Sequence, residues 1–249
     1  MYLFSELQVV PLLLLFLLWG IAGWLMTLRW FDLEPHERGF IGLGLGLLVA
    51  NWLGNFTARF LPMSVAFWAS ALLTLALGLF AAWPLRRDLF LQWRSVRWSA
   101  WLLFAVAVVI FTLIGRGLGM LDDFQNLPLS SLMATGDVPP HFPWRPDTRF
   151  GYHYFLILLG VQFMRVASAA PWTALDLARA VSLTLAIVFT GFIAWRLTRN
   201  KIIAWISGAF FALAGGTRWL LLLLPGTILN RMSEDLTLIG SGRVTADNL

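Results

Sequence analysis

Two adjacent carboxylates, Asp122 and Asp123, follow soon after a long uncharged stretch of the sequence. A carboxylate at a membrane boundary can accept a proton from a hydroxyl or an amine as a general base, or it can bind a divalent cation. The same two residues can also be solvated interfacial charges or helix caps. An adjacent acidic pair is a weak motif, so the residues alone leave both interpretations open.

A second group of polar side chains follows the acidic pair. Arginine carries donors in a planar fork that matches phosphate oxygens, which predicts a phosphate or pyrophosphate ligand. The alternative for each arginine is contact with the headgroup of an anionic lipid. Tyrosines in such a segment are also common interfacial anchors. The predicted substrate-binding group is His141, Arg145, Arg149, Tyr152 and His153.

The composition indicates how these residues are held. The chain has 249 residues, of which 59% are hydrophobic and 12% are charged. An ordinary soluble domain is about 25% charged, so this chain lacks the polar surface of a soluble protein. The net charge is +5, but the basic residues form short clusters between apolar runs, which is typical of membrane topology and excludes a nucleic-acid partner. The absence of cysteine excludes disulfides and thiolate metal sites.

Six apolar runs are predicted to cross the membrane. A span needs roughly 20 apolar residues to cross about 30 Å of hydrocarbon, and its backbone groups must pair internally, so these runs are expected to be α-helices. The last two runs are short and are extended to about residues 177–197 and 202–222. The runs are Val9–Leu28, Phe40–Ala58, Phe60–Leu85, Trp98–Gly115, Ala180–Trp195 and Ile202–Thr217.

Arginines and Lys201 predict the orientation. The densest cluster, Arg86 to Arg97, is placed in the cytoplasm, which puts the N-terminus and the 116–176 loop on the outer face of a plasma or inner membrane. If the apolar run Phe150–Met164 also spanned, the basic segment Arg196–Lys201 would lie outside. We therefore predict that Gly151–Ser168 is an interfacial or re-entrant helix on the outer face.

Small and polar residues give local predictions. The alternating Gly42, Gly44 and Gly46 indicate close helix packing, and Asn51 and Asn55 are expected to form hydrogen bonds between helices. In the outer loop, Asn126 is expected to cap a short helix that ends at Gly136. Four prolines then predict an extended path that forms a wall for a lipid-linked substrate; they are Pro139, Pro140, Pro143 and Pro146.

The order of these features resembles the first outer loop of the GT-C superfamily of membrane glycosyltransferases. The resemblance covers roughly Leu102 to Leu224 and includes the acidic pair, the segment Thr135-Gly136-Asp137, the proline-rich stretch and the Gly-Tyr-His-Tyr-Phe element that begins at Gly151. It implies an all-helical fold with two juxtamembrane helices and a polyprenyl-phosphate-linked sugar donor. It also implies that Asp122 acts as base, or positions the acceptor or a divalent cation, with Asp123 where many members have Glu.

These observations predict an all-α polytopic membrane protein of about six transmembrane helices, with juxtamembrane helices on the outer face. Residues 1–97 are expected to be a three-span extension, and residues 98–249 the start of a GT-C-like module that belongs to a longer protein. The predicted function is transfer of a lipid-linked sugar to an acceptor. The alternative is a non-catalytic lipid-binding or assembly protein of the cell envelope. A transporter ranks third, because no internal repeat is found.

Overall fold

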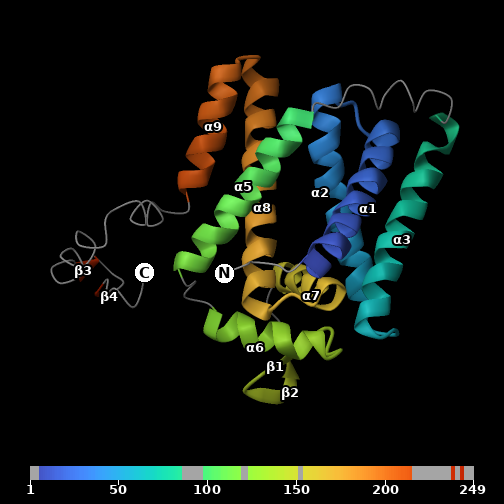
Figure 1. Cartoon of the computed structure of the whole chain (residues 1–249). Coiled ribbons are helices and arrows are strands. Elements are labelled where there is room, and N and C mark those ends of the chain that lie inside the picture. The colour runs from blue at the N-terminus through green and yellow to red at the C-terminus, as the bar shows by residue number, and fades with distance from the viewer. Residues whose placement is uncertain are drawn as a thin grey trace.

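The computed structural model describes residues 6–85, 98–118, 123–150 and 154–214, and two short strands near the C-terminus. Its long helices lie side by side, and shorter elements cover one end of them (Figure 1). The elements are α1 (Glu6–Trp30), α2 (Pro35–Thr57), α3 (Met63–Ala82), η1 (Trp83–Leu85), α5 (Trp98–Leu118), α6 (Asp123–Ala134), β1 (His141–Phe142), β2 (Arg145–Arg149), α7 (Phe155–Ala167), α8 (Pro171–Thr198), α9 (Lys201–Ala214), β3 (Thr237–Leu238) and β4 (Gly242–Arg243).

The fold is all-α and of the multi-pass membrane type, as predicted. In the described part of the chain, five helices are long and apolar enough to cross a membrane: α1, α2, α3, α5 and α8. The sixth predicted span, Ile202–Thr217, corresponds to α9, whose 14 described residues are shorter than a span, and residues 215–217 lie outside the described part.

The long helices form two groups. Helices α1, α2 and α3 pack mainly on one another, and α8 packs on α5 and α9. Within the first group, α1 and α2 approach so closely that a Cβ atom added at Gly46 would lie 1.9 Å from the carbonyl oxygen of Trp19. A Cβ at Gly42 would lie 2.6 Å from the backbone nitrogen of Trp24. The predicted close packing at these glycines is therefore confirmed.

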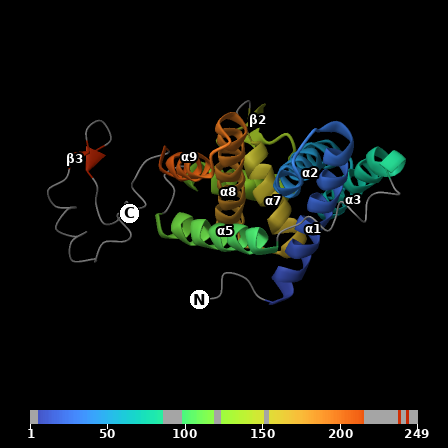
Figure 2. The ribbon, with the colours of Figure 1, turned by 90° about the horizontal axis from the view of Figure 1, so that it is seen from above.

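Helix α7 joins the two groups. It packs most extensively on α8 and also contacts α1, α2, α3 and α6. Seen along the long helices, it runs crosswise between α8 and α1 (Figure 2). The prediction of a short helix inside Gly151–Ser168 is confirmed, and its left-handed C-cap at Ser168 (φ 53°) ends it where predicted. Residues from Ile157 to Phe163 are all buried, so the middle of α7 is enclosed by the protein, whereas Phe155 and Leu156 in its first turn are exposed.

The described connections between the long helices lie at alternate ends of the molecule, as the predicted order of membrane spans requires. The α1–α2 loop and the α8–α9 turn lie at one end, where Arg196 of α8 hydrogen-bonds to Glu37 and to the carbonyl of Asp32. Helices α6 and α7 and the β1–β2 hairpin lie at the opposite end (Figure 1). We call these the ion-pair end and the hairpin end. The segment with the densest arginine cluster, residues 86–97, lies outside the described residues.

Candidate functional site

Helix α6 has two different faces, and this is what creates a site at the hairpin end. Leu129, Met133 and Ala134 are buried and belong to the same apolar cluster as Leu158 and Val161 of α7. The opposite face of α6 carries Pro128, Ser131 and Leu132, and Thr135 follows directly after the helix; these residues line the space between α6 and the hairpin. Because one face of α6 is buried against α7, the opposite face of α6 is held toward the hairpin.

A tight turn brings the chain back under this second face. Gly136 has a φ of 116°, a conformation that side chains rarely adopt, and it follows the end of α6 as the sequence predicted. The predicted cap at Asn126 is wrong, because α6 begins at Asp123 and Asn126 lies inside it. The backbone N–H of Phe150 donates to the carbonyl of Pro140 (2.8 Å), and the Phe142 and Phe150 rings stack with centroids 6.0 Å apart. The predicted extended path is a two-stranded antiparallel hairpin of β1 and β2.

Asp137 and His141 form the polar centre of this turn. One carboxylate oxygen of Asp137 lies 2.6 Å from Nδ1 of His141, and the other accepts the backbone N–H of His141, also at 2.6 Å. An ionised carboxylate only accepts hydrogen bonds, so Nδ1 of His141 carries a proton, and in the neutral form of the ring Nε2 is then an acceptor. The carboxylate thus fixes both the orientation and the tautomer of the imidazole.

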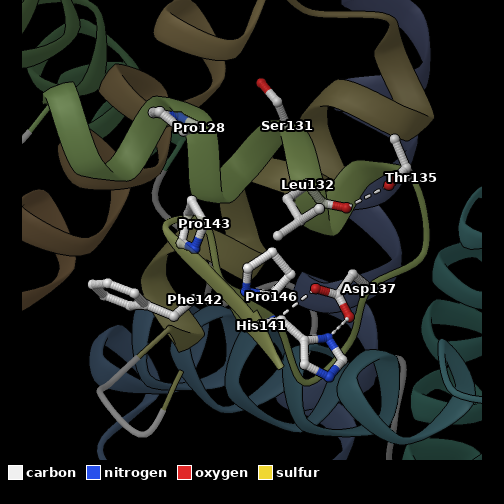
Figure 3. Close-up of a pocket in the computed structure, with 9 residues that line it drawn as sticks. All are labelled: Pro128, Ser131, Leu132, Thr135, Asp137, His141, Phe142, Pro143 and Pro146. Atoms are coloured by element: carbon white, nitrogen blue, oxygen red, sulfur yellow. Dashed lines mark hydrogen bonds and ion pairs between the residues drawn. The ribbon is translucent and has the colours of Figure 1, made fainter. Parts of the chain in front are cut away.

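The two residues lie at the edge of a pocket of about 550 Å³ between α6 and the hairpin. Figure 3 shows the Asp137 carboxylate beside the His141 ring, with the second ring nitrogen pointing away from the carboxylate. The walls are mostly apolar, and Thr135 contributes a hydroxyl that already donates to the carbonyl of Leu132 (2.7 Å). The lining residues are Pro128, Ser131, Leu132, Thr135, Asp137, His141, Phe142, Pro143 and Pro146.

The other predicted site residues are placed differently or lie outside the described part of the chain. Arg145 and Arg149 are exposed on β2, and Nη1 of Arg149 donates to the carbonyl of Pro139 (2.9 Å). Neither arginine lines the pocket that contains His141. Asp123 is the first residue of α6, and in the chain β1 lies between α6 and β2. Asp122, Tyr152 and His153 lie outside the described residues, so their roles stay predictions.

Polar side chains hold α7 in place next to this site. Nδ2 of Asn51 donates to the carbonyl of Phe155 (2.8 Å), and Nε2 of Gln162 donates to Oδ1 of Asn51 (2.6 Å). The Tyr154 hydroxyl donates to Oδ1 of Asn55 (2.8 Å). The predicted role of the two asparagines in hydrogen bonds between helices is confirmed.

A second group of charges lies where α5 meets α8. The Arg116 guanidinium, in the last turn of α5, lies 5.4 Å from the centre of the Trp172 ring. One turn further into α8, Nη1 of Arg179 lies 3.6 Å from a carboxylate oxygen of Asp176, and the Asp176 side chain is only 5% exposed. A Cβ atom at Gly115 would lie 3.5 Å from the same oxygen, so α5 and α8 are in close contact here.

Sequence reasoning missed Asp137 and Asp176 as members of a site. The signal for Asp137 was its position four residues before His141, directly after the glycine that ends α6. Among the described residues, no group of three or more His, Asp or Glu is arranged to hold a metal ion. The predicted divalent cation depends on Asp122 and stays a prediction.

In comparisons with known proteins, no family model, curated protein or solved structure matches the chain.

Proposed function

We propose that this chain is a membrane glycosyltransferase module, which transfers a sugar from a polyprenyl-phosphate-linked donor to an acceptor at the outer membrane surface. The observation that carries the proposal is the position of α6 and α7. Both lie between α5 and α8 in the chain, both lie at the hairpin end, and α6 begins at Asp123 of the acidic pair. This is the order of elements in the family that the sequence resembles.

The surface of α5 supports a lipid-linked donor. This helix leads directly to the acidic pair and has an exposed apolar side, along which a prenyl chain can lie in the membrane. The exposed side chains are Leu102, Leu103, Val106, Val109, Ile110 and Leu113. Arg116 in its last turn is suited to the phosphate of the leaving group, because its guanidinium is a multiple donor and always charged.

The chemistry follows from these positions. A carboxylate of the acidic pair, Asp122 by the resemblance, accepts the proton of the acceptor's hydroxyl as its oxygen attacks C1 of the sugar. The bond from C1 to the phosphate oxygen breaks, and polyprenyl phosphate leaves with the electron pair. Arg116 stabilises that negative charge, and Arg145 and Arg149 are further candidates at the same end of the molecule.

The test is transfer from a radiolabelled polyprenyl-phosphate sugar in proteoliposomes that contain the full chain. Asp122→Asn is expected to lower kcat by about 10² to 10⁴ without changing the amount of inserted protein. Asp147→Asn is the matched control, because Asp147 is an exposed carboxylate on β2 of the same loop. Equal kcat in the wild type and in both Asp122→Asn and Asp123→Asn would contradict the catalytic assignment. Absence of any transfer by the wild type would refute the proposed function and favour the non-catalytic alternative.

A further inference from the structure

We infer that the pocket of Asp137 and His141 is a binding site for a saccharide that carries vicinal hydroxyls, and that this saccharide is the acceptor. That this saccharide is the acceptor rests on the proposed function, whereas the saccharide site itself rests on the geometry of the pocket. The juxtaposition that carries the inference is a fixed carboxylate–imidazole pair at the edge of an apolar pocket large enough for one or two sugar rings.

The polar atoms of the pocket require a ligand that brings hydrogen-bond donors. The Asp137 carboxylate is an acceptor, and in the neutral imidazole that carries its proton on Nδ1 the Nε2 atom of His141 is an acceptor as well. The Thr135 hydroxyl gives its proton to the carbonyl of Leu132, so its free lone pair is an acceptor as well. Adjacent hydroxyls on a sugar ring supply several hydrogen-bond donors from one ligand.

The walls of the pocket require a ligand with an apolar face. Three prolines, Leu132 and Phe142 present hydrocarbon and an aromatic ring, which suit the C–H face of a pyranose. Among the described residues that line the pocket there is no arginine or lysine. The geometry therefore separates the pocket from the predicted phosphate-binding role of Arg145 and Arg149.

The location of the pocket fits an acceptor that arrives from water. Its α6 wall is the face opposite to the one packed on α7, and its other wall, the hairpin, lies beyond α6 from the long helices (Figure 1). The His141 side chain is 34% exposed and that of Asp137 is 20% exposed, so both are within reach of a soluble ligand. A lipid-linked donor approaches along α5 from the membrane, and the soluble acceptor approaches from the other side of α6.

The test is saturation-transfer NMR on the detergent-solubilised full chain, with glucose, galactose, mannose and N-acetylglucosamine as probes. At least one of them is expected to bind with a Kd of about 1 mM. Tetrahydropyranyl methanol is the matched control ligand, because it has the ring but no vicinal hydroxyls, and it is expected to give no signal. Methylammonium is the second control, since a site for amines would bind it as well.

Asp137→Asn is the decisive variant. Its carboxamide oxygen can still accept the His141 N–H, so the turn is retained, but its NH₂ group now donates to Nδ1 and moves the ring proton to Nε2. The saccharide then meets a donor in place of an acceptor, and Kd is expected to rise by about tenfold. Asp147→Asn, outside the pocket, is expected to bind as the wild type does.

A second variant keeps the inference testable if Asp137→Asn changes the fold. Leu132→Trp fills the pocket from α6 without touching the carboxylate or the imidazole, and it is expected to abolish hexose binding. The inference is overturned if no hexose binds to the wild type, if tetrahydropyranyl methanol or methylammonium binds as tightly, or if both variants bind hexose normally. Hexose binding does not require the lipid-linked sugar donor. A failure of sugar transfer therefore does not contradict the saccharide site, and a failure of hexose binding does not contradict the proposed transfer.

Discussion

The two ends of this molecule hold their helices together by different means. At the ion-pair end, the Glu37 side chain is fully buried and accepts two hydrogen bonds from Arg196, at 2.7 and 2.6 Å. At the hairpin end, neutral amides hold α7, and the charged Asp137 is partly exposed. A buried charge needs its partner permanently, whereas a partly exposed carboxylate is available to a ligand. The comparison therefore predicts that the ion pair contributes more to stability than the partly exposed Asp137 does.

The largest expected effect on stability is at the ion-pair end. Arg196→Ala leaves the buried Glu37 carboxylate without its partner, and the free energy of unfolding is expected to fall by about 3 kcal/mol. Thermal unfolding in detergent measures the change. The double variant Glu37→Gln with Arg196→Met removes both charges and is expected to recover most of the loss. If Arg196→Ala unfolds at the wild-type temperature, the ion pair does not stabilise this end.

The glycine contact between α1 and α2 is expected to be next in size. Gly46→Ala places a methyl group against the Trp19 backbone, and the helices must separate, at a cost of about 1 to 3 kcal/mol. Gly20→Ala is the matched control on the same pair of helices, because its Cβ would lie 4.0 Å from Leu43. Equal unfolding temperatures for the two variants would contradict the close approach of the helices.

The amide contacts of α7 are expected to contribute less. Asn51→Ala leaves the Phe155 carbonyl and the Gln162 amide without this partner, which costs about 1 to 3 kcal/mol when such groups are buried. Hydrogen exchange in α7 is expected to increase more than in α8, because the lost bonds join α2 to α7. Uniform exchange in both helices would show that Asn51 does not hold α7.

The smallest expected effect is the pH dependence of an exposed pair at the ion-pair end. The hydrogen bond from Arg199 holds the pKa of the Glu34 carboxyl below its ordinary value. A lowered pKa in the folded state stabilises the fold above the ordinary glutamate pKa of about 4.3, and this contribution is lost as pH falls through the folded pKa. The unfolding temperatures of the wild type and Glu34→Gln are therefore expected to converge at acid pH. A constant difference between them would contradict this assignment.

The apolar runs predicted the helices well because a bilayer allows few other structures. Their ends were less accurate. The run predicted from Phe40 begins at Pro35, because Glu34 and Glu37 form a capping box, and α3 begins at Met63 because Pro62 precedes it. Neither cap changes the hydropathy of the run that follows, so composition did not reveal them.

The site was harder to predict than the helices, because its residues come together through a turn and no sequence motif links them. His141 was predicted as a substrate-binding residue together with Arg145 and Arg149, and only the turn at Gly136 brings Asp137 against its ring. Similarly, Glu37 and Arg196 are separated by 159 positions, so no local spacing links them. The acidic pair was recognised from its order relative to the predicted elements, and the position of α6 after α5 agrees with that order.

The enclosed position of α7 sets an order of assembly. Synthesis proceeds from the N-terminus, so α1, α2 and α3 can associate through their glycine contacts before α7 leaves the ribosome. Helix α7 needs α8 as well, since α8 is its most extensive neighbour, and α8 is synthesised after it. The hairpin end is thus completed late in biogenesis, and a nascent chain halted before α8 has the three N-terminal helices but lacks the helix on which α7 packs most extensively.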